Sequence, residues 1–150
     1  MSVSVEPLAG FDPAVVLADL LGAHDEFWGG RDTRSLLAPQ WFHQFGGYGL
    51  LVRDADRSVG YLLGVVTRAG IGYVHALAVR PAYRRLGLGR EMWGLFGAKA
   101  AASGAHELQA ITHPSNLGSI AFHTGLGMSA EEILEYAGPG EPRVLFHRAL

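Results

Sequence analysis

The chain has 150 residues, of which 49% are hydrophobic and 17% charged, a balance that predicts one folded domain spanning residues 1–150. It contains no cysteine, which excludes a disulfide framework, a thiolate metal site and a cysteine nucleophile. A net charge of −2 argues against a nucleic-acid-binding protein. The amino-terminal residues show neither a signal peptide nor a membrane-length apolar run, so we expect a cytoplasmic protein without membrane contact.

The first third of the chain predicts mainly helix. Val3–Val5 is a candidate short strand. Asp12 has the character of a helix N-cap, and Pro13 suits the first helical position after it. A second helical stretch is expected from Asp32 to Phe45, and Pro39 is expected to interrupt it.

The middle of the chain predicts strands. Three apolar segments joined by short turns, Tyr48–Arg53, Val59–Arg68 and Ile71–Val79, indicate an antiparallel meander. A helix from Gly87 to Ser103 and a strand from Glu107 to His113 are expected to follow.

The last part predicts a short helix from Asn116 to Leu126 and two late strands, Ile133–Ala137 and Arg143–Arg148. The strand–helix–strand step after the meander implies a parallel pair of strands. The element order therefore predicts an α/β fold with a mixed sheet that is parallel around the crossover.

Several familiar site motifs are incomplete. Gly87-Leu-Gly89 lacks the third glycine of a dinucleotide fingerprint, because Met92 stands at that position. The seven histidines include no pair at i and i+4 on a predicted helix, so we expect no metal site.

One segment combines features that suit an anion. A strand ends near Val79, basic residues turn the chain, and a helix begins near Gly87. The first N–H groups of a helix have no internal acceptor, and the helix dipole adds positive potential there. Arg84, Arg85 and Arg90 add charge, so the segment predicts a cradle for a pyrophosphate. The alternative is a plain strand–helix turn that uses glycine for packing.

The same segment resembles the acyl-CoA-binding motif of the GNAT superfamily of acyltransferases, Arg/Gln-x-x-Gly-x-Gly/Ala. Arg84, Gly87 and Gly89 match it. A later segment is similar to the second motif of the family, Asn-x-x-Ala-x-x-Phe-Tyr-x-x-x-Gly-Phe. The matching residues there are Asn116, Phe122 and Gly127, whereas Ser119, His123 and Met128 replace Ala, Tyr and Phe.

The resemblance implies a mostly antiparallel central sheet with a parallel, V-shaped split and flanking helices. It also implies acetyl-CoA as co-substrate, lying in the split between the third-strand edge and the Glu107–His113 strand. Backbone groups at the strand edge would pair with the pantetheine, and the backbone amides that follow would hold the pyrophosphate. The implied acetyl-CoA-binding residues are Leu77, Val79, Arg84, Arg85, Leu86, Gly87, Leu88, Gly89, Arg90, Asn116 and Phe122. Asn116 also suits an N-cap, and the two roles are compatible.

Two histidines are the candidate catalytic residues. His75 stands where the family often has a glutamate base, and a histidine has a suitable pKa for that work. His123 stands where a family tyrosine usually protonates the departing thiolate. The alternative for His75 is a satisfied core or rim histidine, and for His123 a side chain that only fills the tyrosine position.

Asp25, Glu26 and Trp28 are the candidate acceptor residues, because carboxylates beside an aromatic ring suit a cationic amine. The alternative is a solvated helix end. We expect an N-acetyltransferase acting on a primary amine of a small molecule. Acetylation of a protein amino terminus or lysine, a catalytically weak acyl-CoA-binding domain, and a homodimeric state are left open.

Overall fold

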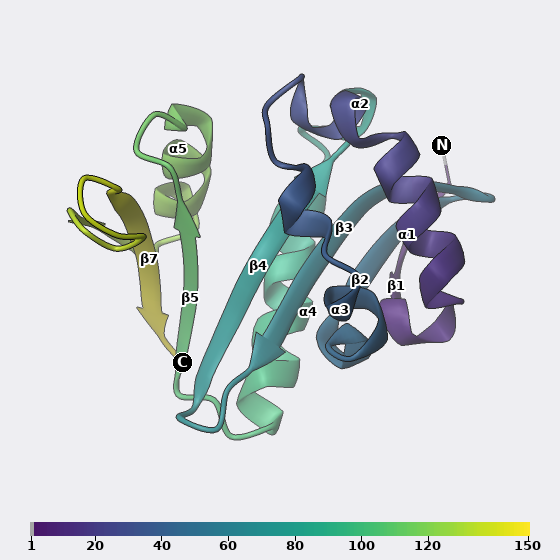
Figure 1. Cartoon of the computed structure of the whole chain (residues 1–150). Coiled ribbons are helices and arrows are strands. Elements are labelled where there is room, and N and C mark those ends of the chain that lie inside the picture. The colour runs from purple at the N-terminus through teal and green to yellow at the C-terminus, as the bar shows by residue number, and fades with distance from the viewer. Residues whose placement is uncertain (1) are drawn as a thin grey trace.

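The structure, a computed structural model that describes residues 2–150, contains a seven-stranded sheet in the order β1-β2-β3-β4-β5-β7-β6 (Figure 1). Neighbouring strands are antiparallel except β4 and β5, which are parallel. The predicted mixed sheet is therefore confirmed. The strands are β1 (Val3–Pro7), β2 (Leu50–Asp54), β3 (Arg57–Val66), β4 (Ile71–Val79), β5 (Glu107–Thr112), β6 (Ser129–Ile133) and β7 (Arg143–Ala149).

The helices cover both faces of this sheet. Asp12 caps the first one as predicted, because its carboxylate accepts the N–H groups of Ala14 and Val15. On one face lies the long helix, with the last short helix beside it, and the first three helices lie on the other face (Figure 1). The helices are α1 (Pro13–Gly22), α2 (His24–Trp28), α3 (Gln40–His43), α4 (Leu88–Ala102) and α5 (Leu117–Gly125).

Two predicted elements were wrong in their extent. The helix expected over 32–45 is a 3₁₀ turn, Arg34–Leu37, followed by the short α3. Pro39 sits at the N-cap of α3, where its missing N–H does no harm, and it separates the two pieces. The strand expected over 133–137 is β6, which ends at Ile133, and the apolar Leu134 and Tyr136 lie exposed in the loop after it.

Two apolar clusters hold the layers together. One lies between the sheet and α4 and includes Met92, Phe96 and Phe146, each at most 1% exposed. The other lies under α1–α3 and includes Leu20 and Phe27. None of the helices within residues 2–150 is long and apolar enough to cross a membrane.

The parallel pair is short, and this shortness opens the sheet. β4 and β5 pair only from Ile71 to Val74 on β4 and from Glu107 to Ala110 on β5. Beyond this point the two strands spread apart towards their carboxyl ends (Figure 1). The second half of β4 therefore stays paired with β3 on one side and presents a free backbone edge on the other.

Candidate active site

A cleft of about 1160 Å³ occupies the opening between β4 and β5. Its walls come from α2 and the segment after it, from β4, from the β4–α4 loop, from the end of β5 and from α5. This volume lies just above the range of roughly 300–1,000 Å³ that is typical of small-molecule pockets. The sequence-predicted residues that line it are Glu26, Trp28, His75, Leu77, Val79, Arg84, Arg85, Gly87, Leu88, Gly89, Arg90, Asn116, Phe122 and His123.

The free edge of β4 points its backbone groups into this cleft. Arg80 donates its N–H to the carbonyl of Val59 on β3. Antiparallel pairs alternate between bonded and non-bonded positions, so Leu77 and Val79 fall at the non-bonded ones. Their N–H and C=O groups face away from β3 and into the split, which suits an extended amide chain such as pantetheine.

The β4–α4 loop forms a cradle of unpaired donors. Among the described residues, no backbone carbonyl accepts an N–H from residues 85–90. These N–H groups precede and open the 15-residue helix α4. Arg85 and Gly87 both adopt left-handed backbone conformations, with φ of 63° and 77°. The loop therefore turns successive amides toward one place, as a pyrophosphate requires.

Gly89 fits the cradle for a second reason, which is close packing. A Cβ at this position would lie 2.9 Å from Cζ of Phe122, so the bare backbone lets α5 approach α4. Phe122 thus contacts the glycine of the other motif. Leu86 is the one residue of the predicted loop that does not line the cleft, and its side chain is 53% exposed.

Arg84 and Arg80 tie the loop to α2. The Arg84 guanidinium donates to the carbonyls of Val79 and Phe27, both at 3.0 Å. Arg80, only 5% exposed, donates to the Ser58 carbonyl and forms an ion pair with Glu26. Two of the five N–H donors of the Arg84 guanidinium thus position the backbone, and the amides of residues 85–90 add further donors for an anion.

Asn116 is the N-cap of α5, as the sequence suggested. Its side-chain oxygen accepts the N–H of Ser119 at 3.2 Å. No described residue accepts a hydrogen bond from its amide NH₂ group, which lies at the cleft wall and can serve a ligand.

His75 lies at the junction of the cleft and the acceptor-side helices. The register of β3 and β4 shifts at this residue, because Leu63 and Gly64 pair with Ala76 and Val74. His75 is thus the extra residue of a β-bulge, a feature that re-aims a side chain. Its Nε2 lies 3.0 Å from the Leu36 carbonyl, and its ring stacks on Trp41 with centroids 4.1 Å apart.

This geometry decides which nitrogen of His75 is free. A carbonyl only accepts, so Nε2 carries the hydrogen, and Nδ1 of the neutral ring holds the lone pair. Burial lowers the pKa of His75 below its ordinary value despite the opposing effect of the Leu36 carbonyl. The ring is therefore neutral at pH 7 and able to accept a proton.

His123 is held in the opposite tautomer from His75, with the hydrogen on Nδ1. Its Nδ1 donates to the Ser119 carbonyl at 2.8 Å, and its ring stacks on Phe146 with centroids 4.2 Å apart. Burial lowers the pKa of His123 as well, against a smaller raising effect of the Ser119 carbonyl. The neutral ring then carries no hydrogen on Nε2, so donation from that nitrogen requires the imidazolium.

The three predicted acceptor residues do not meet in one site. Glu26 pairs with Arg80 and Arg57, so its charge is already balanced. The indole of Trp28 donates to the hydroxyl of Tyr61 at 2.8 Å. Asp25 is not among the residues that line the cleft. Glu26 and Trp28 do line the cleft, but their polar groups are paired with other residues of the fold.

Four residues that belong to the site were not selected in the sequence analysis: three of them line the cleft, and the fourth packs against His75. Tyr73 lines the cleft two residues before His75, and burial raises its pKa to about 12. Arg31 and Arg143 line its acceptor side. Trp41, on α3, stacks on the ring of His75. Only Tyr73 had a local signal, since strand periodicity places residues 73 and 75 on one face.

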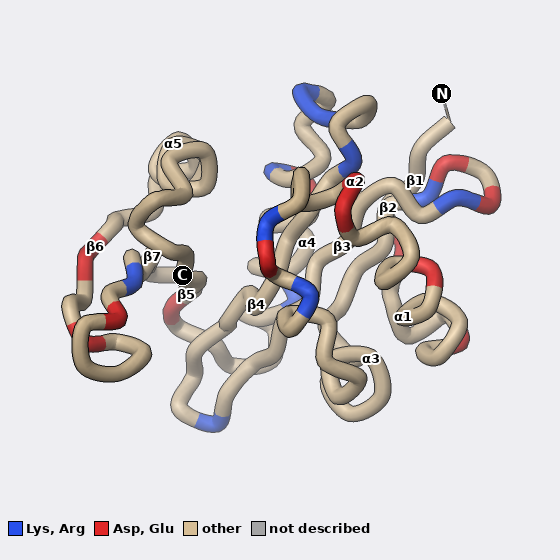
Figure 2. Tube along the Cα trace, turned by 45° about the horizontal axis from the view of Figure 1, so that its top comes forward, with Lys and Arg blue, Asp and Glu red and all other residues tan. Residues whose placement is uncertain are grey.

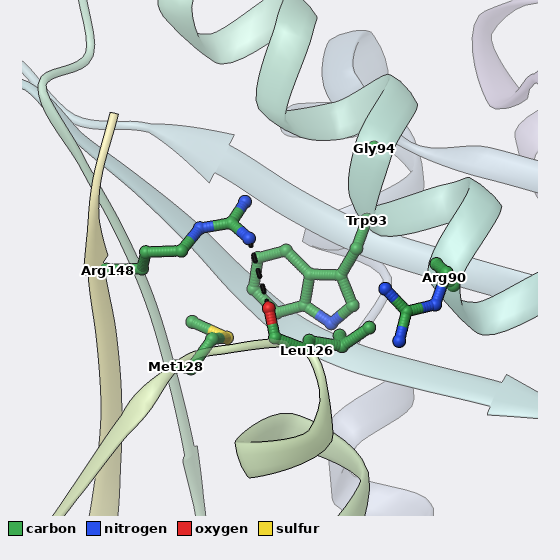
Figure 3. A pocket seen from close by; sticks show the side chains of 6 residues that line it. All are labelled: Arg90, Trp93, Gly94, Leu126, Met128 and Arg148. Atoms are coloured by element: carbon green, nitrogen blue, oxygen red, sulfur yellow. Dashed lines mark hydrogen bonds between the residues drawn. The ribbon is translucent and has the colours of Figure 1, made fainter.

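A second, smaller pocket of about 170 Å³ lies between α4 and the α5–β6 turn (Figure 3). Trp93 forms its floor, and Arg148 donates to the Leu126 carbonyl at 3.2 Å across it. It shares Arg90 and Leu126 with the large cleft but contains neither candidate catalytic histidine.

The sequence was compared with models of known protein families. The family model for the GNAT acetyltransferase family matches residues 17–128, which is most of the chain. The chain belongs to the GNAT acetyltransferase family. It is an acyltransferase of that family, and acetyl-CoA is its co-substrate. None of the curated proteins matches the sequence.

Solved structures share the GNAT fold over nearly the whole chain. Ard1 from Thermoplasma volcanium superposes with a TM-score of 0.78 at 14% identity, covering 100% of this chain and 99% of that one. PH1933 from Pyrococcus horikoshii OT3 superposes with a TM-score of 0.76 at 13% identity, covering 99% of this chain and 100% of that one. The ribosomal-protein-S18-alanine N-acetyltransferase from Escherichia coli superposes with a TM-score of 0.73 at 15% identity, covering 99% of this chain and 94% of that one. At these identities the likeness shows the fold alone.

Proposed function

We propose that this GNAT protein transfers an acetyl group from acetyl-CoA to a primary amine of a small molecule by direct attack. One observation carries the proposal: a single cleft runs from the unpaired amides of residues 85–90 to the neutral imidazole of His75. A donor held by its pyrophosphate at one end would reach an amine at the other, so binding brings the reactants together.

Acetyl-CoA supplies a thioester, and the residues of the chain orient it. The backbone of Leu77 and Val79 would extend the β4 edge with the pantetheine, and the Asn116 amide would add a hydrogen bond. Free N–H groups along the same edge are placed to polarise the thioester carbonyl. Phe122 and the amides of 85–90 would complete the donor half.

His75 is proposed as the base. The amine nitrogen bonds to the acetyl carbonyl carbon, and the carbon–sulfur bond breaks with its electron pair on sulfur. A protonated amine loses two protons overall: one passes through Nδ1 of His75 to solvent, and the other replaces the proton that the thiolate takes up as it leaves. A lowered pKa keeps Nδ1 available at neutral pH, as a general base requires.

His123 is proposed as the proton donor to the thiolate, in its imidazolium form. The hydrogen bond from Nδ1 to Ser119 is kept in that form, and Nε2 then carries the second hydrogen. Because burial disfavours the imidazolium, its assistance is expected to be weaker than that of His75.

The test is acetyl-CoA turnover, followed by thiol release, over a panel of small amines, amino-terminal peptides and lysine peptides. His75→Gln should lower kcat/KM by on the order of 10²-fold and remove the acid limb of its pH profile. Unchanged acetyl-CoA affinity by calorimetry would show that the loss is catalytic. Turnover of peptides alone would move the acceptor to a protein amino group, and binding without any turnover would make the chain a sensing domain. A cytoplasmic location and a homodimeric state stay predictions.

A further inference from the structure

The acceptor half of the cleft is short of negative charge. Two acidic residues line the cleft, Glu26 and Asp32. Glu26 is already neutralised by the buried Arg80 and by Arg57. Of these two carboxylates, only that of Asp32 forms no ion pair within residues 2–150, and it is exposed beside Arg31.

Positive charge, in contrast, stands on both walls of the acceptor half. Arg31 comes from the segment after α2, and Arg143 begins β7. Figure 2 shows Lys and Arg positions on both of these segments, and Arg31 and Arg143 line the same cleft. These two arginines are separate from Arg84, Arg85 and Arg90, which belong to the donor loop.

The two guanidinium groups have donors to spare. Arg143 is half-buried, with 27% of its side chain exposed, so its stem is held by the fold. Its side chain donates to the Pro142 carbonyl at 2.7 Å and lies 3.8 Å from the exposed Glu141. No side-chain hydrogen bond or ion pair within residues 2–150 involves the guanidinium of Arg31. A guanidinium carries five N–H donors in a fork that matches a carboxylate.

Tyr73 adds a neutral donor to the same cleft, with its ring centroid 6.1 Å from that of His75. Its phenol stays protonated at every ordinary pH, because burial raises its pKa to about 12. Apart from the exposed Asp32 carboxylate, the proposed proton acceptor of the acceptor half is Nδ1 of His75, and the hydrogen-bond donors include Arg31, Arg143 and Tyr73. A molecule that fits this pattern carries an amine at one point and an oxygen anion at another.

We infer that the acceptor is an amine that also carries a carboxylate, of the amino-acid class, with the amine at His75 and the carboxylate on Arg143 and Arg31. The inference rests on the proposed function and names the substrate class of the same site. The amine must give its ammonium proton to Nδ1 of His75 before it attacks, whereas the carboxylate stays ionised and anchors the molecule through charge-assisted hydrogen bonds.

The test uses matched acceptors that differ only in this charge. Amino acids and their carboxamides are compared in the parent enzyme, with each rate corrected for the fraction of unprotonated amine. The carboxylates should be used at least tenfold more efficiently, as expected for a hydrogen bond to a charged group. Their KM should rise with salt, because exposed charges are screened.

Arginine variants then assign the charge to residues. Arg143→Gln and Arg31→Gln should raise the KM of the carboxylate about tenfold or more in combination and leave the carboxamide unchanged. Arg68→Gln removes the same charge from the β3–β4 turn, outside the cleft, and should change neither acceptor. Equal use of carboxylate and carboxamide by the parent, or equal losses for both in Arg143→Gln, would overturn the inference.

A binding arm separates this inference from the proposed function. Calorimetry in the presence of CoA measures the affinity for an N-acetyl amino acid and for its carboxamide. This measurement does not depend on turnover. Tighter binding of the carboxylate, lost in the arginine variants, supports the inference even if catalysis fails. Equal binding of the two compounds contradicts it, and acetylation of peptides with amidated carboxyl ends in preference to amino acids contradicts it as well.

Discussion

The indole of Trp41 lies nearly parallel to the imidazole of His75, with ring centroids 4.1 Å apart and planes inclined by 9°. These residues come from α3 and from the bulge of β4, and the Leu36 carbonyl holds the far nitrogen of the same ring. Two independent contacts thus fix the plane and the tautomer of the proposed base, leaving Nδ1 to the cleft.

The first prediction concerns this stack. Trp41→Leu should lower kcat of the parent about tenfold with little change in the KM for acetyl-CoA, since a misaligned base weakens proton transfer. Trp41→Phe keeps an aromatic face and should retain most of the activity. The measurement is the pH dependence of kcat/KM, together with ¹⁵N shifts of the His75 ring. Identical ring shifts in parent and Trp41→Leu would show that Trp41 only fills space.

The second prediction concerns the donor loop. Gly89→Val should weaken acetyl-CoA binding by at least tenfold, because a Cβ would lie 2.9 Å from Phe122 and displace α5 from α4. Gly94→Ala is the matched control in the same helix, since a Cβ there meets nothing within 4 Å. That change should leave affinity intact and add up to about 1 kcal/mol of stability. Calorimetry with CoA and thermal unfolding of both variants decide the matter.

The third prediction concerns His123. If the imidazolium protonates the thiolate, His123→Phe should lower kcat on the order of tenfold, and His123→Tyr should be tolerated. Phenylalanine suits the surroundings, because the ring already stacks on Phe146 and meets Trp93 edge-on. A His123→Phe enzyme as active as the parent, with CoA affinity retained, would leave thiolate departure unassisted by this side chain.

The fourth prediction is loss of stability in acid. Burial lowers the pKa of His75 and His123 in the folded protein. Below pH 6.5 the unfolded chain therefore binds more protons than the folded one, and the free energy of unfolding decreases as pH falls through that range. Denaturant titrations at pH 7.5 and 5.5 should show a smaller decrease for His123→Phe than for the parent. Equal decreases would mean that His123 does not contribute.

The fifth prediction separates a structural Glu26 from a substrate-binding one. Glu26→Gln removes the partner of Arg80, which is almost fully buried, and should destabilise the protein by about 1 kcal/mol, a modest value because the glutamate itself is half-exposed. The KM for the amine should change less than twofold. A large rise in KM without loss of stability would return Glu26 to the acceptor site.

Most of the elements could be predicted from the sequence, and so could the residues proposed for the donor half of the site. Local conformation decided these features, because left-handed φ at Gly87, helix capping by Asp12 and Asn116, and apolar periodicity act within a few residues. The two motifs around Gly89 and Phe122 were recognisable separately, and the fold brings them into contact.

Tertiary structure decided the acceptor half. Glu26 meets Arg80 across 54 residues, and the stack of Trp41 on His75 depends on how α3 packs over the bulge of β4. Neither relation leaves a local pattern, since the pairing of charges and rings far apart in the chain is set by strand register and helix packing. For the same reason β6 ends at Ile133: its register against β7 leaves the apolar Leu134 and Tyr136, which suggested a longer strand, in the loop.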